Sequence, residues 1–399
     1  MNEHNSLPNM RFKGFTDKWK QEKLGNIATV EMNKRIYKNQ TNEKGEIPFY
    51  KIGTFGKKAD SFISNKLFNE YKKKYPYPKV GDILISASGT IGNTIVYKGE
   101  DAYFQDSNIV WLNINHNIIL NSFLYGFYQI VHWRGIEGST IKRLYNSNIL
   151  STSINYPSVN EQQKIGNLFT KLDKLLYLQQ QKIEKLELLK KALLQKLFPK
   201  HDAKIPELRF KGYDHEWEEK KFSSLYKKCN EKNNLSFGND KIISVANMYY
   251  KKDNVKSDDN YMKTYNIFRL GDIAFEGHKS KKFTFGRFVE NTIGDGIVSH
   301  VFEVFRPISN GDITYWKYAI HNEDFIAPIL MKSTVKATMM NNLIAKDFLK
   351  QRVPVPQLSE QQNIGNLLSK VDQLIELENK KLENLQQFKK CLLQNMFVD

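Results

Sequence analysis

One long segment occurs twice in this chain, and the repeat constrains the fold more than any other feature. Residues 161–198 and 360–397 align without gaps at an offset of 199, and 20 of the 38 aligned positions are identical. Such close identity indicates an internal duplication, so the sequence predicts two units of one architecture. A lead-in is repeated as well, because PNMRFKGFTDKW at 8–19 returns as PELRFKGYDHEW at 206–217.

Both copies of the segment predict a long helix, because their apolar residues recur with the 3-4 alternation of a coiled-coil seam. Both seams break at the same place, at Gln179 and Lys182 and again at Glu378 and Lys381, which we interpret as a shared stutter. The expected seam is Ile165, Leu168, Leu172, Leu175, Leu186, Leu189 and Leu193 in the first copy, and Ile364, Leu367, Val371, Leu374, Leu385, Phe388 and Leu392 in the second.

The helices are expected to begin at similar signals and to pack against each other. Asn160 and Ser359 are good N-cap residues, with Gln163 and Gln362 three positions later as in a capping box. About 38 residues make a rod of roughly 55 Å. Because the apolar seams are too extensive to leave in water, we expect an antiparallel coiled coil, the alternative being two separate surface helices.

The segments between lead-in and helix are rich in β-branched and aromatic runs punctuated by Gly, Asn and Pro, with short helical stretches at 122–133 and 314–321, which predicts compact α+β folds. The predicted fold class is therefore α+β, with two pseudo-twofold-related α/β recognition domains separated by the two helices. The predicted domains are residues 1–160, 161–199 (central helix), 200–359 and 360–399 (C-terminal helix).

The composition indicates a polyanion-binding protein of the cytoplasm. The formal net charge is +17 and the pI about 9.4, a balance that favours nucleic acid as a partner. Two cysteines far apart in sequence fit a reducing compartment and offer no disulfide or zinc framework. The polar first twenty residues and the absence of an 18-residue apolar run predict neither a signal peptide nor a membrane span.

Catalytic motifs are missing from the sequence. It contains no phosphate-binding P-loop, no dinucleotide-binding glycine turn, no nucleophile elbow and no His/Cys metal cluster. Asp214, Glu218 and Lys220 form a string of the kind that nucleases use, but the other copy of the lead-in does not keep its spacing. A solvated charged turn is the preferred interpretation of this string, and no catalytic, metal or cofactor residue is predicted.

Two loops shared by the otherwise different middle segments are the best candidates for DNA contacts. A GDI strand at 81–83 and 271–273 leads into the first loop, and ST(I/V)K at 139–142 and 333–336 marks the second. Lysine and arginine neutralise phosphates, whereas polar side chains on rigid loops can read base edges. The predicted DNA-binding residues are Ser86, Ser88, Thr90, Asn93, Lys142 and Arg143 in the first half and Lys279, Lys281, Lys282, Arg287 and Lys336 in the second.

A basic-aromatic run at 71–77 (YKKKYPY) is a weaker candidate for nucleic-acid binding, with a solvated face as the alternative. The glycines of Gly89-Thr-Ile-Gly92 predict a tight turn after the first GDI strand.

The doubled order of PxxRFxG(F/Y)xxxW lead-in, GDI strand and EQxxIGxL helix resembles the DNA specificity subunits of type I restriction-modification systems over essentially the whole chain. The resemblance implies two target-recognition domains, each of which reads half of a bipartite, asymmetric double-stranded DNA site. It also implies two adenine methyltransferase subunits as partners, with restriction subunits joining through them. The S-adenosylmethionine and ATP/Mg sites would then belong to the partners, and this chain would be non-catalytic. The alternatives are a stand-alone DNA-acting enzyme such as a nuclease, and a coiled-coil scaffold.

Overall fold

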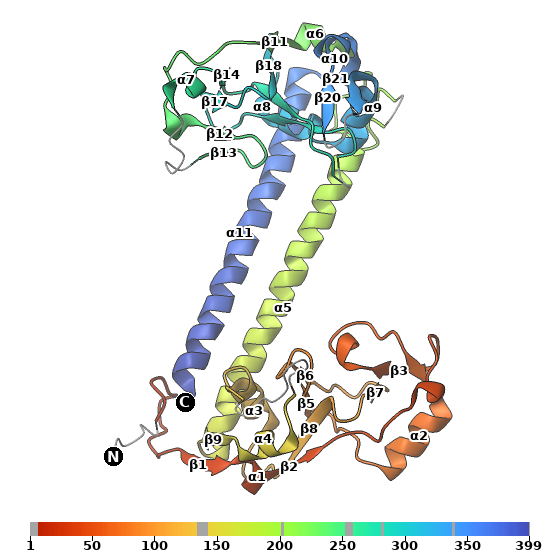
Figure 1. The fold of residues 1–399 in the computed structure, drawn as a ribbon, viewed down its shortest axis with the longest axis vertical. Helices are drawn as coiled ribbons and strands as arrows, with labels where there is room; N and C mark the ends of the chain where they lie inside the picture. The colour runs from red at the N-terminus through yellow and green to blue at the C-terminus, as the bar shows by residue number, and fades with distance from the viewer. Residues whose placement is uncertain are drawn as a thin grey trace. The chain divides into compact units, whose positions relative to one another are not determined.

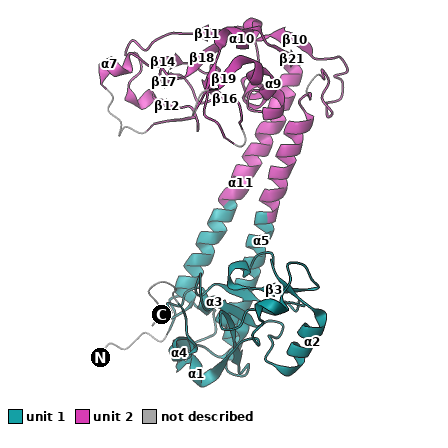
Figure 2. Cartoon of the chain, turned by 45° about the vertical axis from the view of Figure 1, so that its right-hand side comes forward, with its two compact units in different colours: residues 1–180, 381–399 teal, residues 181–380 magenta. Residues whose placement is uncertain are grey.

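The structure, a computed structural model, describes residues 7–133, 143–200, 203–251, 258–280, 283–336 and 340–398. The chain forms two compact units (Figure 2): unit 1 comprises residues 1–180 and 381–399, and unit 2 comprises residues 181–380. Each unit therefore contains one mixed α/β head, the amino-terminal half of one long helix and the carboxyl-terminal half of the other.

Unit 1 begins with the repeated lead-in and ends its head just before the first long helix (Figure 1). Its elements are β1 (Lys20–Lys23), α1 (Leu24–Ile27), β2 (Ala28–Glu31), η1 (Lys38–Gln40), β3 (Ile47–Tyr50), η2 (Ile52–Thr54), β4 (Phe62–Ile63), α2 (Asn65–Lys74), β5 (Ile83–Ser86), β6 (Thr94–Val96), β7 (Tyr103–Phe104), β8 (Ile109–Ile114), α3 (Asn121–Tyr128), α4 (Asn146–Ser151) and β9 (Ser153–Tyr156).

The head of unit 2 follows the same plan. Its elements are β10 (Glu218–Lys221), α6 (Phe222–Leu225), β11 (Tyr226–Cys229), η3 (Asn239–Lys241), β12 (Ile243–Ser244), β13 (Tyr249–Tyr250), α7 (Asp259–Met262), β14 (Asn266–Phe268), β15 (Ile273–Glu276), β16 (Arg287–Glu290), β17 (Gly296–Val298), β18 (Glu303–Pro307), α8 (Ile313–Ala319), α9 (Glu323–Ser333), β19 (Thr334–Lys336), β20 (Asn341–Leu343), α10 (Ala345–Lys350) and β21 (Arg352–Val355).

A four-stranded antiparallel sheet forms the centre of each head, with strand order β2-β8-β5-β6 in unit 1 and β11-β18-β15-β16 in unit 2. Successive side chains of a strand point to opposite faces. Ile83 and Ile85 accordingly join one hydrophobic cluster and Leu84 another, so both faces of the sheet are covered. Ile273, Phe275 and Ala274 divide in the same way in unit 2. The predicted GDI strands are confirmed as the central strands of these sheets.

The long helices are α5 (Val159–Lys196) and α11 (Leu358–Met396), and they run antiparallel within each unit. In unit 1, Phe397 at the end of α11 packs on Phe123 and on Phe169 near the start of α5, with ring centroids 5.0 and 5.8 Å apart. Lys389 of α11 forms an ion pair with Asp173 of α5 at 2.5 Å.

Unit 2 repeats this arrangement with the two helices exchanged. Phe198, just after α5, packs on Tyr315 of α8 at 5.6 Å, and Lys190 of α5 pairs with Asp372 of α11 at 2.5 Å. The α+β fold class, with two heads and two antiparallel long helices, is thereby confirmed.

The predicted seam was wrong in the middle of both helices. Leu175, Leu189, Leu374 and Phe388 are 46–53% exposed, whereas Ile183 and Glu378 are 3% exposed. The inward face follows Leu172, Leu176, Gln179, Ile183, Leu186, Lys190 and Leu193 in α5, and Val371, Ile375, Glu378, Leu382, Leu385, Lys389 and Leu392 in α11. This is an uninterrupted heptad spacing, so the proposed stutter is replaced by polar positions within a regular seam.

The polar positions persist in the seam because they have partners. Lys182 bonds to the buried carboxylate of Glu378 at 3.0 Å, and a buried carboxylate is tolerated when it is paired in this way. The predicted N-caps were also displaced, because the helices begin at Val159 and Leu358, so Asn160 and Ser359 lie inside the first turn.

Candidate nucleic-acid interface

The GDI motif builds the same tight turn in both heads, immediately before the central strand. Gly81 and Gly271 adopt left-handed φ values of 95° and 85°, which favour glycine. The carboxylates of Asp82 and Asp272 accept hydrogen bonds from the backbone N–H groups of the residues three positions earlier, at 2.7 and 2.8 Å. The motif therefore fixes where β5 and β15 begin, and with them the loops that follow.

In unit 1 the loop between β5 and β6 is a tight turn held by buried hydroxyls. The Ser86 hydroxyl, 1% exposed, donates to the carbonyl of Thr90 and accepts the backbone N–H of Asn93 at 2.9 Å. Gly89 and Gly92 have positive φ values, which confirms the predicted turn. Thr90 and Asn93 are exposed at its tip. Ser86 therefore shapes the loop, while Thr90 and Asn93 present side chains to solvent.

The second candidate segment of unit 1 lies directly against this turn. Ser88 and Arg143 form an isolated β-bridge, and Leu144 donates its N–H to the carbonyl of Ala87 at 2.8 Å. The buried Ser88 hydroxyl donates to the side chain of Asn108 at 2.8 Å. Arg143 bonds to the carbonyl of Ser107 at 3.1 Å and is half-buried. Two segments that are some fifty residues apart in sequence thus form one surface.

Unit 2 pairs the corresponding segments in the same way. His278 forms an isolated bridge with Met340, and Asn341 donates its N–H to the carbonyl of Gly277 at 2.8 Å. The Asn341 amide also donates to the carbonyl of Thr284 at 3.0 Å, which ties the loop after β15 to β20. His278, like Ser88, lies six residues after the GDI aspartate, so the two bridges are structurally equivalent.

The basic residues of the unit 2 loop differ in how far they are committed to internal contacts. Arg287 pairs with Glu276 at 2.6 Å, bonds to the carbonyl of Ala246 at 3.2 Å and lies over the ring of Phe283. Lys279 is half-buried, and Lys336 is exposed on β19. Arg287 therefore braces the base of the loop in this conformation, and Lys336 faces solvent.

Three of the predicted DNA-binding residues, Lys142, Lys281 and Lys282, lie outside the described residues. In unit 1 the structure brings together Ser86, Ser88, Thr90, Asn93 and Arg143. In unit 2, Lys279 and Arg287 lie in or at the base of the loop after β15. That loop pairs with the β19–β20 hairpin, which carries Lys336. DNA contact by any of them stays a prediction.

One neighbouring loop was missed by the sequence reasoning. In unit 1, η2 lies beside the turn between β5 and β6, because a Cβ added to Gly89 would lie 3.3 Å from Ile52 of η2. The exposed Lys57 and Lys58 follow η2 and so lie near this turn. The signal available was the glycine-flanked basic run GTFGKK, which has no counterpart in the second half of the sequence.

The repeated motifs outside these loops anchor each long helix to its head. Arg11 of the lead-in grips Glu161 of α5 through two bonds of 2.7 and 2.8 Å, and Arg209 grips Glu360 of α11 at 2.7 and 2.9 Å. Hydrogen bonding to the glutamate raises the pKa of each guanidinium above its ordinary value, so the arginine stays charged.

The residues that follow the glutamate serve the same purpose. The side chain of Gln162 accepts the N–H of Leu120 at 2.9 Å, and the side chain of Gln361 accepts that of Asp312 at 3.0 Å. The arginine and glutamine bonds together place the lead-in arginines in the helix–head junctions.

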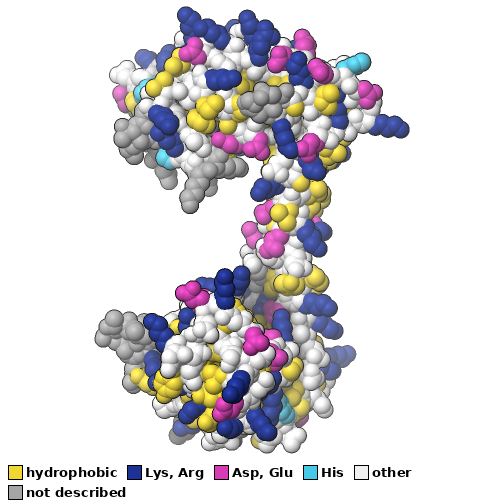
Figure 3. Space-filling model, turned by 90° about the vertical axis from the view of Figure 1, so that its right-hand side faces the viewer, with side chains coloured by type: hydrophobic (Ala, Val, Ile, Leu, Met, Phe, Trp, Pro, Cys, Tyr) yellow, Lys and Arg dark blue, Asp and Glu magenta, His cyan; other side chains and the backbone are white. Residues whose placement is uncertain are grey.

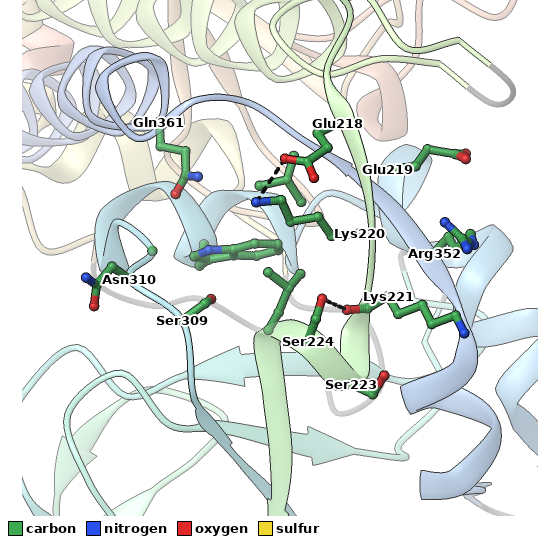
Figure 4. Close-up of a pocket in the computed structure, with 14 residues that line it drawn as sticks. Glu218, Glu219, Lys220, Lys221, Ser223, Ser224, Ser309, Asn310, Arg352 and Gln361 are labelled. Carbon is green, nitrogen blue, oxygen red and sulfur yellow. Dashed lines mark hydrogen bonds and ion pairs between the residues drawn. The ribbon is translucent and has the colours of Figure 1, made fainter.

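The nuclease-like string lies at a cavity of about 430 Å³ in unit 2 (Figure 4). Lys220 pairs with Glu218 at 3.1 Å, and Arg352, Ser224 and Gln361 also line the cavity. Asp214 does not line this cavity, but Asp214, Glu218 and Lys220 all line a second cavity of about 420 Å³. The described residues contain no group of three or more His, Cys, Asp or Glu side chains that could hold a metal ion. The string therefore keeps its interpretation as a charged, solvated turn.

Comparison with known proteins assigns the family. A family model described as type I restriction modification DNA specificity domain matches residues 16–188 and again residues 215–387. The chain therefore belongs to the type I restriction-modification DNA specificity family, whose members are recognition subunits. Among the part of the chain that the structure describes, we find no helix with the length and apolar character needed to cross a membrane.

Two curated relatives carry matching names. A putative type I restriction enzyme specificity subunit from Haemophilus influenzae is 57% identical over 152 residues, which is 38% of this chain and 40% of that protein. A putative type I restriction enzyme MjaX specificity subunit from Methanocaldococcus jannaschii is 25% identical over 414 residues, covering 94% of this chain and 92% of that one.

Solved structures of low sequence identity share the fold. The S subunit of a type I restriction-modification system from M. genitalium has a TM-score of 0.59 at 15% identity and covers 98% of this chain and 99% of its own. A chain from a study of complex assembly and conformational transition of the type I R-M system has a TM-score of 0.52 at 14% identity, covering 95% of this chain and 97% of that one.

Proposed function

We propose that the two heads read the two halves of a bipartite DNA site and direct partner methyltransferase and restriction subunits to it. The observation that carries this proposal is the paired loop surface. In each head the loop after the GDI strand is bridged to the segment after ST(I/V)K, on equivalent scaffolds with different side chains. A rigid scaffold with variable loops is the usual arrangement for selective binding.

The side-chain chemistry of the two surfaces suits different roles. Thr90 and Asn93 in unit 1 carry donors and acceptors that can pair with base edges, whereas Lys279 and Lys336 in unit 2 carry only donors and suit phosphates or guanine. The two half-sites should therefore differ in sequence. S-adenosylmethionine and ATP with Mg would be bound by the partners, in accordance with the family resemblance.

The test is to express the chain with its methyltransferase partner and to map the modified bases across a genome. We expect one bipartite sequence with two unlike halves. The variant Thr90→Ala/Asn93→Ala should relax or change one half-site and leave the other half and the spacer intact. Unchanged recognition at both halves would exclude the unit 1 turn as a reader, and DNA cleavage by the purified chain alone would favour the nuclease alternative.

Partner docking is best supported by exposed residues that are identical in both copies of the long helix. Buried identities are explained by packing, but exposed ones are not. Such pairs include Gln163/Gln362, Asn167/Asn366, Lys171/Lys370, Leu178/Leu377, Lys191/Lys390 and Gln195/Gln394. Leu178 and Leu377 are 49% and 48% exposed, so each surface includes an apolar contact point.

Two equivalent surfaces predict two copies of one partner. Replacing Lys171 by Glu should reduce the bound methyltransferase subunits from two to one, replacing Lys370 by Glu should do the same, and the double variant should bind none. The stoichiometry of the purified complex by light scattering measures this. Retention of two subunits by the double variant would place docking elsewhere.

A further inference from the structure

Unit 1 carries a basic-aromatic surface that the paired loops do not include. Two segments form it: residues 34–38, which follow β2, and residues 72–75, at the end of α2. We call this surface the α2 patch, and its members are Lys34, Arg35, Tyr37, Lys38, Lys72, Lys73, Lys74 and Tyr75, all of them exposed. Figure 3 shows a face of unit 1 on which dark-blue Lys and Arg side chains and yellow apolar ones are scattered, with fewer magenta acidic ones.

A buried asparagine holds the two segments together. Asn33, 2% exposed, donates from its side-chain amide to the carbonyl of Pro76 at 3.2 Å and accepts the N–H of Phe104 at 3.2 Å. The hydroxyl of the fully buried Tyr103 donates to the carbonyl of Lys34 at 3.0 Å. The patch is therefore fixed in place by the core beneath it.

Three lysines of the patch have charges that no carboxylate among the described residues neutralises. Arg35, Lys72 and Lys74 pair with Asp106, Asp101 and Glu70 at 2.9, 3.1 and 2.9 Å. Lys34, Lys38 and Lys73 form no ion pair within the described ranges, and Lys34 lies 5.3 Å from the ring centre of Tyr75. The patch keeps a net positive charge at close spacing.

Helix stabilisation explains only part of this charge. Lysines in the last turn of α2 interact favourably with the helix dipole, which accounts for residues 72–74. Lys34 and Lys38 lie outside that helix, so the dipole gives no reason for them.

Unit 2 keeps the buried asparagine but carries different residues around it. Asn233, also 2% exposed, donates to the carbonyl of Met262 at the end of α7 at 3.4 Å, as Asn33 does at the end of α2. The residues that follow it are Asn234, Leu235 and Ser236. Asp258 and Asp259 lie at the start of α7, and a single exposed lysine, Lys263, follows its end. Since the asparagine anchor is kept and the basic residues directly after it are not, the anchor itself does not require them.

We propose that the α2 patch binds the phosphate backbone of duplex DNA outside the bases read by the paired loops, and that it supplies affinity without sequence information. This inference rests on the proposed function. Lysine ammonium groups on long stems suit phosphates, which they contact without distinguishing bases. The asymmetry between the units means that DNA is held more firmly on the unit 1 side.

The test uses the full chain and compares Lys34→Ala/Lys38→Ala/Lys73→Ala with a matched control. The control, Lys18→Ala/Lys20→Ala/Lys23→Ala, removes the same charge from exposed lysines on and before β1 in the same unit. Binding is measured from 50 to 200 mM salt on the duplex that carries the mapped site, on an unrelated duplex and on single-stranded DNA. Each released phosphate contact contributes about 0.9 to the slope of log affinity against log salt.

We expect the patch variant to bind both duplexes about 10- to 100-fold more weakly, with a salt slope lower by roughly 2 to 3 and an unchanged ratio between them. The control should change affinity much less. Unchanged affinity and slope in the patch variant would overturn the inference, as would a loss confined to single-stranded DNA or to the specific duplex. If the wild-type chain shows no salt-dependent duplex binding at all, the proposed function itself fails.

Discussion

The ion pair between Arg11 and Glu161 should be the single most important polar contact between a head and its long helix. Glu161 is fully buried and its carboxylate is gripped at both oxygens, while the arginine side chain is 14% exposed. Arg11→Ala leaves a buried carboxylate without its partner, and breaking a buried pair from one side costs about 3–5 kcal/mol. Because the geometry recurs at Arg209 and Glu360, Arg209→Ala should cost unit 2 a similar amount.

The assay has to separate the two units, because a chain of two units need not unfold in one transition. Hydrogen exchange of the amides in residues 159–169 reports on unit 1, and exchange in residues 358–368 reports on unit 2. We expect Arg11→Ala to lower protection in the first range and leave the second unchanged. Arg35→Ala is the control, because the Arg35 side chain is 58% exposed in its pair with Asp106, and a pair of this kind is worth about 1 kcal/mol or less.

A double variant separates the charge from the fold. Arg11→Met/Glu161→Met removes both charges while keeping apolar volume, so it should recover most of the loss caused by Arg11→Ala. An effect of Arg11→Ala no larger than that of Arg35→Ala would refute the reasoning, because it would mean that Glu161 finds water or another donor in the variant.

The remaining predictions concern packing, pH and helix length. A Cβ at Gly166 would lie 2.5 Å from Ser122 Cβ, and one at Gly365 would lie 2.8 Å from the backbone nitrogen of Tyr315. Gly166→Ala and Gly365→Ala should therefore each lower the free energy of unfolding by about 1–3 kcal/mol. Gly53→Ala should be nearly neutral, because a Cβ there has no atom within 4 Å. Burial, together with the charge of Asp312, raises the pKa of Glu290 well above its usual range. The contribution of Glu290 to stability should therefore be greatest below its unfolded-state pKa and should be lost as the pH rises through its folded-state pKa. Glu290→Gln should abolish this pH-dependent contribution, as measured by melting temperatures over a pH series. Seven residues inserted after both Leu178 and Leu377 keep the heptad spacing and add about 10.5 Å to each helix. The spacer between the mapped half-sites should then lengthen by roughly three base pairs, with both half-sites unchanged. An unchanged spacer would show that helix length does not set the distance between the half-sites.

Much of the architecture could be predicted from the sequence because duplication makes the chain its own comparison. The two heads, the long helices and the GDI strands follow from repeated motifs and local periodicity. The detailed seam could not be predicted, because Leu175 and Leu176 both fit a 3-4 pattern and tertiary packing decides which of them faces the partner helix. The choice of Leu176 carries the spacing through Gln179 to Ile183, and this removes the apparent stutter.

The candidate site was predictable to the level of loops and not of side chains. The shared GDI and ST(I/V)K motifs indicated which loops correspond, but not that a backbone bridge joins them. The sequence also could not show that the Ser86 hydroxyl is consumed by its own turn or that Arg287 is bound to Glu276. Serine and arginine serve a turn or a buried pair as readily as they serve a ligand, and only the three-dimensional neighbours decide between these roles.

The duplication therefore divides the residues of this chain into classes, according to whether the two copies are identical and whether the side chains are buried or exposed. Residues that are identical and buried, such as Glu161 and Glu360 with their arginines, hold each helix to its head. Residues that are identical and exposed, such as Lys171 and Lys370, have no internal reason to match, and the proposed partner common to both halves would supply one. Residues that differ after a shared anchor, such as Lys34 and Asn234, mark the surfaces on which we propose that the two halves treat DNA differently. The first class thus serves the fold and the other two point to different ligands, so substitutions among exposed residues of one class should leave the function of the other unchanged.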